Sequence, residues 1–167
     1  MCGAELSKLP DGVQRVAAFL QTSGHLRMPN MLQDAARTAQ QAADALGVEL
    51  GQIAKSIIFK RKSDNAAVLV ITSGDKRVDE AKVQALVCDD SGKLGRADAD
   101  FVKLKTGFAI GGVAPVAHLT APVTLLDKEL FRFETVWAAA GHPNAVFEVS
   151  PQALQLLANA PVVDVVV

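Results

Sequence analysis

Two apolar segments joined by a short polar connection constrain the fold of this 167-residue chain more than any other feature. Residues 53–61 (IAKSIIFKR) and 67–72 (AVLVIT) are rich in β-branched side chains, which favour strands. The connection Lys62-Ser63-Asp64-Asn65 has the composition of a tight turn. Together these segments predict a β-hairpin.

The other segments mix helices and strands without βαβ alternation. Hydrophobic periodicity predicts helices over residues 11–23, 34–46, 78–87 and 98–106, with a capping box between Asp11 and Gln14, and Ser150-Pro151 opens a further helix. Apolar runs predict strands at residues 108–110, 123–126 and 145–149 and an edge strand within 162–167. Residues 127–130 read as a turn or short helix. We expect one α+β domain whose mixed sheet curls toward a barrel.

Charge and cysteine content exclude several classes of protein. Seventeen basic and eighteen acidic residues give a net charge of −1, which argues against a protein that holds nucleic acid mainly by its field but not against contact with the tip of an RNA. Neither Cys2 nor Cys88 lies in a metal-binding motif. The sequence shows no signal peptide and no apolar run of membrane-spanning length. We expect a soluble, cytoplasmic protein without metal or cofactor.

Lys55 interrupts the first strand segment. If side chains alternate from Ile53, then Ile53, Lys55, Ile57 and Phe59 share one face, and Lys55 lies over an apolar surface. A lysine in that position extends its charge to solvent, finds a partner or loses its proton. Lys55 therefore has two interpretations. Either its aliphatic chain lies over the apolar surface at the strand end while the ammonium reaches solvent, or its ammonium has a functional role.

Residues 111–115 (GGVAP) form a second unusual segment. Paired glycines let the backbone approach a ligand closely and present N–H groups to an anion. The alternative is a tight turn that requires positive φ. The segment is neither a dinucleotide-binding GxGxxG loop nor a Walker loop, because no GK[ST] follows.

Several polar residues have both a structural and a functional interpretation. His142 lies in a predicted turn, where it either forms the edge of a pocket or makes hydrogen bonds to backbone groups of the turn. Asp127 is either a helix cap or a pocket acid, and Thr38 lies near an alanine stripe from which it could reach a cleft. Ser56 and Ser73 have no visible His–Asp partners, which argues against a serine-hydrolase triad.

Five segments in order, IAKSIIF, SGDKRVD, KTGFAIGGVAP, LLDKELF and WAAAGHPNAVFEVSP, resemble the YbaK/prolyl-tRNA editing family. That family includes stand-alone ProX-type deacylases and the editing domain inserted in bacterial prolyl-tRNA synthetases. The resemblance runs from about Thr38 to the C-terminus and implies a YbaK-like fold over residues 34–167, preceded by a helix and connection in residues 1–33. The GHPN stretch resembles the alanine-type and related ProX branches more than YbaK proper, which weakens any carry-over of the Cys-tRNA specificity associated with YbaK.

The resemblance also implies the site. The family's catalytic lysine corresponds to Lys55 and its GxxxP loop to residues 111–115, and Ser56 stands where some relatives have threonine. We expect catalytic roles for Lys55, Gly111 and Gly112, and substrate contacts from Thr38, Ser56, Ser73, Thr106, Pro115, Asp127, Ala140, Gly141 and His142.

The implied activity is hydrolysis, in trans, of a small amino acid wrongly esterified to tRNA, with tRNA(Pro) the first candidate. An aminoacyl ester is already reactive, so such an enzyme needs positioning and charge stabilisation more than a strong base. Lys55 and the Gly111–Gly112 amides would hold the ester carbonyl or a terminal phosphate, and the substrate's ribose hydroxyl would help to activate water, as is proposed for the family. Expected partners are the tRNA acceptor end and, transiently, prolyl-tRNA synthetase or an elongation factor. The alternatives are a module that binds an aminoacyl end or a nucleotide without hydrolysis, and a hydrolase of small esters.

Overall fold

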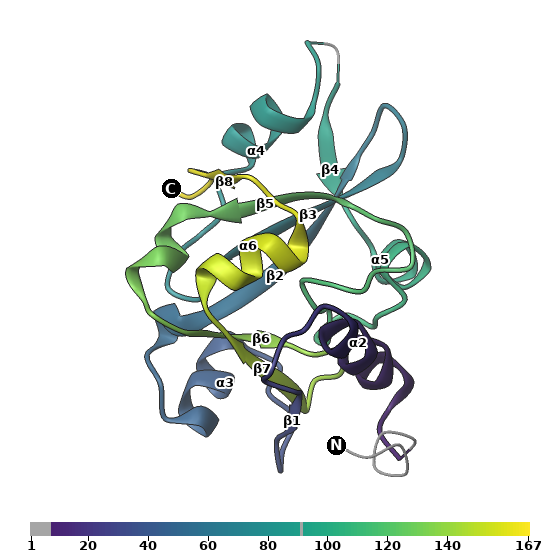
Figure 1. Cartoon of the computed structure of the whole chain (residues 1–167). Helices are drawn as coiled ribbons and strands as arrows, with labels where there is room; N and C mark the ends of the chain where they lie inside the picture. The colour runs from purple at the N-terminus through teal and green to yellow at the C-terminus, as the bar shows by residue number, and fades with distance from the viewer. Residues whose placement is uncertain (1–7, 91) are drawn as a thin grey trace.

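The computed structural model describes residues 8–90 and 92–167, and within them eight strands form one mixed sheet (Figure 1). The order across the sheet is β1-β7-β6-β2-β3-β5-β8, and β4 pairs with β2 beside this path. The strands are β1 Asn30–Met31, β2 Ile53–Arg61, β3 Ala66–Ser73, β4 Leu94–Arg96, β5 Val123–Asp127, β6 Val136–Ala139, β7 Ala145–Val149 and β8 Val162–Val163. The predicted α+β class with a mixed sheet is confirmed.

Short helices surround the sheet (Figure 1). They are α2 Asp11–Thr22, α3 Ala39–Leu46, α4 Glu80–Val87, α5 Ala99–Thr106 and α6 Pro151–Ala158, with 3₁₀ turns η1 Leu50–Gln52 and η2 Lys128–Arg132. Ser150 caps α6 through its hydroxyl and Pro151 occupies the first position, as the sequence predicts.

The predicted hairpin of β2 and β3 lies at the centre of the sheet. Strand β3 is buried on both faces, which explains its uninterrupted apolar run. Leu69 and Ile71 belong to the main core with side chains of α2 and α6, whereas Val68 and Val70 belong to a second cluster with Val83 of α4. The sheet is therefore covered on both sides.

The helix predicted over residues 34–46 begins only at Ala39. Thr38 is its N-cap: the Thr38 hydroxyl accepts the N–H of Gln41, whose side chain accepts the N–H of Thr38. The preceding segment stays outside the helix because its amides bond to the β6–β7 turn, with Ala36 N–H donating to Pro143 C=O at 2.9 Å. This segment thereby reaches the site described below.

Other predicted elements differ from the structure. Residues 108–110 are not a strand, because Ala109 to Gly112 form a turn closed by Gly112 N–H donating to Ala109 C=O. The expected capping box of Asp11 is absent, since Pro10 is the N-cap of α2 and makes no side-chain bond. Helix α4 starts two residues later than expected, after Asp79, and the short strands β1 and β4 carry no clear pattern in the sequence.

Among the described residues, no helix is long and apolar enough to cross a membrane. The same part of the chain contains no group of three or more metal-ligating side chains arranged to hold an ion. Cys88 is a free thiol, and Cys2 lies outside the described residues.

Candidate functional site

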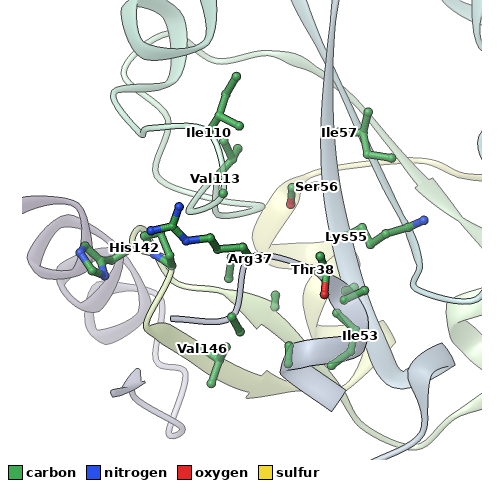
Figure 2. A pocket seen from close by; sticks show the side chains of 18 of the residues that line it. Arg37, Thr38, Ile53, Lys55, Ser56, Ile57, Ile110, Val113, His142 and Val146 are labelled. Atoms are coloured by element: carbon green, nitrogen blue, oxygen red, sulfur yellow. The ribbon is translucent and has the colours of Figure 1, made fainter. Parts of the chain in front are cut away.

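A cavity of about 370 Å³ lies beside β2 (Figure 2). Five segments line it: the start of α3 with the residues before it, strand β2, the β4–α5 region, the glycine turn at residues 110–113, and β6 with the turn into β7. Many of its lining side chains are small or apolar: Ala36, Ala39, Ala42, Ile53, Ala54, Ile57, Ile58, Ala97, Val102, Ile110, Val113, Trp137, Ala138, Ala139, Pro143, Ala145 and Val146. Polar lining residues are few, which is typical of sites that orient a small ligand.

The wall formed by β2 has an open backbone edge. On one side β2 pairs with β3 along residues 54–61. On the other side it pairs with β6 only at Ile53 and Ala54, and with β4 only at residues 59–61. Within the described chain, no strand pairs with residues 55–58 on this side, and these four residues line the cavity.

Ser56 presents polar groups at this gap. Ile53 C=O bonds to Gly74 beyond β3, and Lys62 N–H bonds to Lys93 on the β4 side. Because successive strand residues direct their backbone groups to opposite sides, Ser56 directs its N–H and C=O to the open edge. Its Oγ is buried without a hydrogen-bond partner among the described residues. A buried hydroxyl without a partner is costly, so it is a natural contact for a ligand.

Lys55 lines the cavity, but its ammonium points elsewhere. The alternation predicted from Ile53 is confirmed: Figure 2 shows Lys55 and Ile57 on one side of β2, with Ser56, Ile110 and Val113 on the other. Lys55 Nζ donates to Lys76 C=O at 2.7 Å. Burial lowers the Lys55 pKa below its ordinary value, and the negative charge of Asp75 partly offsets this. The ammonium therefore rests on one neutral carbonyl, on the far side of β2 from the glycine turn.

The glycine turn offers different amides from those expected. Gly112 N–H is already bonded to Ala109 C=O at 3.0 Å, and a Cβ at Gly112 would meet the backbone of His142 at 2.8 Å. Gly112 is thus a packing glycine and does not line the cavity. Gly111 has φ 94° and lines the cavity together with Val113. Within the described residues neither Gly111 N–H nor Val113 N–H has a hydrogen-bond acceptor.

His142 lies at the opposite wall from β2 (Figure 2). Its Nδ1 accepts the N–H of Asn144 at 3.1 Å, and its C=O accepts the N–H of Ala145 at 2.9 Å. Because Nδ1 is an acceptor, the neutral ring carries its proton on Nε2 and can donate it. The two interpretations of His142 are compatible: it supports the turn and it lines the cavity.

Thr38 and Arg37 enter the site from the start of α3. The Thr38 hydroxyl is engaged as the helix cap, and the backbone N–H of Arg37 donates to the Gln41 side chain at 2.9 Å. The Arg37 side chain is free to extend, and Figure 2 shows it reaching across the cavity toward Val113 and His142. Among the described residues, Arg37 is the arginine that lines this cavity.

Two of the expected contacts are structural side chains away from the cavity. Asp127 is fully buried, caps η2 by accepting Glu129 N–H at 3.1 Å, and accepts Val165 N–H at 3.2 Å. Burial raises the pKa of its carboxyl. Ser73 donates to Gly51 C=O and accepts from the Arg132 guanidinium at 2.9 Å. The structure does not bring either residue to the cavity.

Four more expected contacts also lie outside the cavity lining. Thr106 is buried at the end of α5, where its hydroxyl donates to Val102 C=O at 2.7 Å. Pro115 and Ala140 are buried behind the site. Gly141 has φ 96°, and an added Cβ would stand 2.5 Å from the backbone of Gly12 in α2, so this glycine lets the helix dock on the turn.

Sequence reasoning gave no functional role to Trp137 or Arg132. Trp137 of β6 lines the cavity, and its signal was only its place in an apolar run. Arg132 contacts Asp75, 57 residues away along the chain, and no local pattern reveals such a pair.

Comparison with known proteins agrees with this fold. Residues 33–157 match the family profile described as aminoacyl-tRNA editing domain. YwhH of Bacillus subtilis (strain 168), an uncharacterized protein, is 35% identical over 117 residues, which cover 70% of this chain and 72% of YwhH. EbsC of Enterococcus faecalis, described as a candidate Cys-tRNA(Pro)/Cys-tRNA(Cys) deacylase, is 23% identical over 77% of this chain and 76% of EbsC.

Solved structures are similar over nearly the whole chain. A crystal structure described as a candidate trans-editing enzyme for prolyl-tRNA synthetase has a TM-score of 0.87 and 39% identity, covering 96% of this chain and 99% of that one. The structure of the hypothetical protein APE2540 has a TM-score of 0.83 at 29% identity, covering 92% and 99%. The profile match over most of the chain, supported by these relatives, shows that the chain belongs to the aminoacyl-tRNA editing domain family.

Proposed function

We propose that this protein is an aminoacyl-tRNA deacylase that hydrolyses, in trans, the ester of a small amino acid misattached to tRNA, with tRNA(Pro) the first candidate. The observation that carries the proposal is the cavity at the open edge of β2, where an unpartnered hydroxyl lies near free backbone amides and Lys55 forms part of the wall with its ammonium on the other side of the strand. The family membership supports the same activity.

The cavity suits a small ester. Its volume of about 370 Å³ is at the lower end of the roughly 300–1,000 Å³ usual for ligand sites. Ala54 and Ala138 form its floor and are both buried in the main core, so the floor is fixed by packing. A rigid apolar floor accepts small side chains and excludes larger ones by overlap.

Hydrolysis requires that the negative charge forming on the ester oxygen be stabilised. The amides of Gly111 and Val113 and the Oγ of Ser56 are donors at the cavity that have no other partner in the described chain, and the N–H of Ser56 and the guanidinium of Arg37 lie at the same cavity. They replace the Gly111–Gly112 pair expected from the sequence, because Gly112 N–H closes the turn.

Lys55 supplies the cation in this proposal. To act on the substrate, its ammonium exchanges Lys76 C=O for an ester or phosphate oxygen. A phosphate oxygen, or the oxyanion that forms at the ester carbonyl, carries negative charge and accepts the ammonium hydrogen bond more strongly than a peptide carbonyl does. The gap in strand pairing beside residues 55–58 leaves the lysine stem room to turn around the strand edge.

In the proposed reaction, water adds to the ester carbonyl, the bond to the ribose oxygen breaks, and that oxygen takes up a proton as the free amino acid leaves. The substrate's neighbouring ribose hydroxyl assists the attacking water. The tRNA end would approach past Arg37, whose guanidinium at the mouth can pair with a phosphate. With a net charge of −1 the protein makes few such contacts, so tRNA affinity should be weak and only moderately salt-dependent.

The test is a deacylation panel on Ala-, Ser-, Thr-, Cys-, 2-aminobutyryl- and Pro-tRNA(Pro), with free aminoacyl esters for comparison. The proposal predicts release of one or more small amino acids from tRNA, sparing of Pro-tRNA(Pro), and slow cleavage of free esters. Binding without hydrolysis at high enzyme concentration would instead identify a binding module, and equal cleavage of free esters would identify a hydrolase of small esters.

A further inference from the structure

A polar cluster beside the cavity is not explained by substrate binding alone. It consists of Arg132, Asp75 and Ser73, and none of the three lines the cavity. The cluster lies directly next to the carbonyl that holds Lys55. We propose that Arg132 is a positioning residue that keeps Asp75 from capturing the Lys55 ammonium, so that the lysine stays available to the substrate. This inference rests on the role proposed for Lys55.

All three nitrogens of the Arg132 guanidinium make hydrogen bonds. Its Nη2 lies 2.8 Å from Asp75 Oδ1 and its Nη1 lies 3.1 Å from Asp75 Oδ2, a two-pronged pair. The same Nη2 donates to Ser73 Oγ at 2.9 Å, and Nε donates to Glu129 C=O at 2.7 Å. The ring of Phe133 lies 4.9 Å away beneath it. These contacts fix the guanidinium from several directions.

The segment that Arg132 holds is itself fixed to β2. Lys76 N–H donates to Ser73 C=O at 3.0 Å, which closes a turn containing Asp75. Gly74 N–H donates to Ile53 C=O at 2.7 Å, and an added Cβ at Gly74 would stand 2.4 Å from Leu50 C=O. The Lys76 carbonyl is therefore presented to Lys55 from a rigid turn.

Asp75 is the carboxylate that can compete for the lysine. It precedes Lys76 in the chain, and its negative charge already acts on Lys55, whose pKa it raises against the effect of burial. A carboxylate accepts an ammonium hydrogen bond more strongly than a peptide carbonyl does. In the structure both Asp75 oxygens are occupied by Arg132, and Lys55 bonds to the carbonyl instead.

Loss of Arg132 would therefore have a specific consequence. The freed Asp75 carboxylate would pair with Lys55, and the substrate would have to break an ion pair before it could use the cation. Removal of the Asp75 charge as well would abolish the trap. This makes a purely structural role and the proposed role distinguishable, because only the proposed role predicts that a second substitution restores activity.

The experiment compares single-turnover deacylation by wild type, Arg132→Gln, Asp75→Asn and the double variant, each confirmed as folded by thermal unfolding. The inference predicts a loss of roughly tenfold or more for Arg132→Gln, a small effect for Asp75→Asn, and a double variant several-fold faster than Arg132→Gln, in the range of couplings within one network. If Arg132→Gln does not fold, Arg132→Lys, alone and with Asp75→Asn, gives the same comparison.

Arg61→Gln is the matched control, because Arg61 makes the same two-pronged pair with Asp64, at 2.8 and 3.0 Å, away from Lys76. It should deacylate at the wild-type rate. A wild-type rate for Arg132→Gln, or a double variant no faster than Arg132→Gln, overturns the inference while the proposed function stands. Absence of deacylation by wild type instead overturns the proposed function itself, and an equal rate for Lys55→Ala overturns the role of Lys55 on which this inference rests.

Discussion

Replacing Gly141 with alanine should detach helix α2 from the turn that carries His142. The added Cβ would lie 2.5 Å from both the carbonyl carbon and the oxygen of Gly12, and 3.0 Å from Val13 N. These neighbours are backbone atoms of a packed helix, so they cannot move aside singly. Relief of the overlap requires a shift of the helix or of the turn.

The expected cost combines two terms. Overpacking of this kind costs about 1–3 kcal/mol. The backbone at Gly141 has φ 96°, where a side chain adds about 1–2 kcal/mol. The sum is a loss of about 2–5 kcal/mol in the free energy of unfolding, which lowers Tm by roughly 4–20 °C in a domain of this size.

Gly111→Ala separates the two terms. Gly111 has nearly the same φ, 94°, but its added Cβ would meet only Pro143 Cγ at 3.7 Å, an ordinary contact. Urea unfolding, followed by the fluorescence of Trp137, the single tryptophan, and by circular dichroism, gives both free energies. The docking argument predicts that Gly141→Ala loses at least about 1 kcal/mol more than Gly111→Ala. Equal losses would show that backbone strain alone is at work and would refute the argument.

Three further predictions concern the site. Ser56→Ala should not lower the free energy of unfolding, because Oγ has no partner to lose and a buried hydroxyl without a partner is itself costly, yet it should lower kcat/KM several-fold. A stability loss with unchanged kcat/KM would contradict the assigned contact. Burial lowers the Lys55 pKa below its ordinary 10.5, so as pH rises Lys55 loses its positive charge at a lower pH than an exposed lysine does. The deacylation rate of wild type divided by that of Lys55→Arg should therefore fall on the alkaline side. A ratio that stays constant with pH would contradict the role of the Lys55 charge. Thr38→Ala removes the cap of α3 and should cost about 0.5–2 kcal/mol by urea unfolding, with Gln40→Ala, whose side chain reaches only Asp44, as the control that stays near wild type.

The strands at the centre of the sheet could be predicted because the apolar residues of each strand follow one another in the sequence. Strand β3 is buried on both faces, and its uninterrupted apolar run makes this visible in composition. Strand β2 packs into the main core through Ala54 and into the second cluster through Phe59. The alternation that places Lys55 beside Ile57 follows from the same local rule. Strands β1 and β4 could not be predicted, because they are two and three residues long and exist only through their partners.

The site was only partly predictable for a related reason. The cavity brings together Lys55, Ser56, Gly111, Thr38 and His142 as expected. The remaining expected contacts lie outside the cavity lining. Asp127, for example, comes directly after a strand, as pocket acids often do, but its oxygens are used by two backbone amides.

The orientation of Lys55 and the amide pair at the glycine turn required the structure. Nothing in the sequence shows that Gly112 N–H closes a turn while Gly111 and Val113 remain free. Nor does it show that Arg132 and Asp75 meet across 57 residues. Both depend on contacts between segments far apart in the chain.

The central claim, that a positive charge at Lys55 drives ester hydrolysis, is tested most directly by the single-turnover rate of Lys55→Ala on mischarged tRNA(Pro) at saturating enzyme. Binding of a tRNA whose amino acid is attached by a stable amide would be measured in parallel. We predict that Lys55→Ala loses on the order of a hundredfold or more in rate while it still binds, as when a main electrostatic group is removed from an active site. A rate equal to that of wild type would contradict the claim.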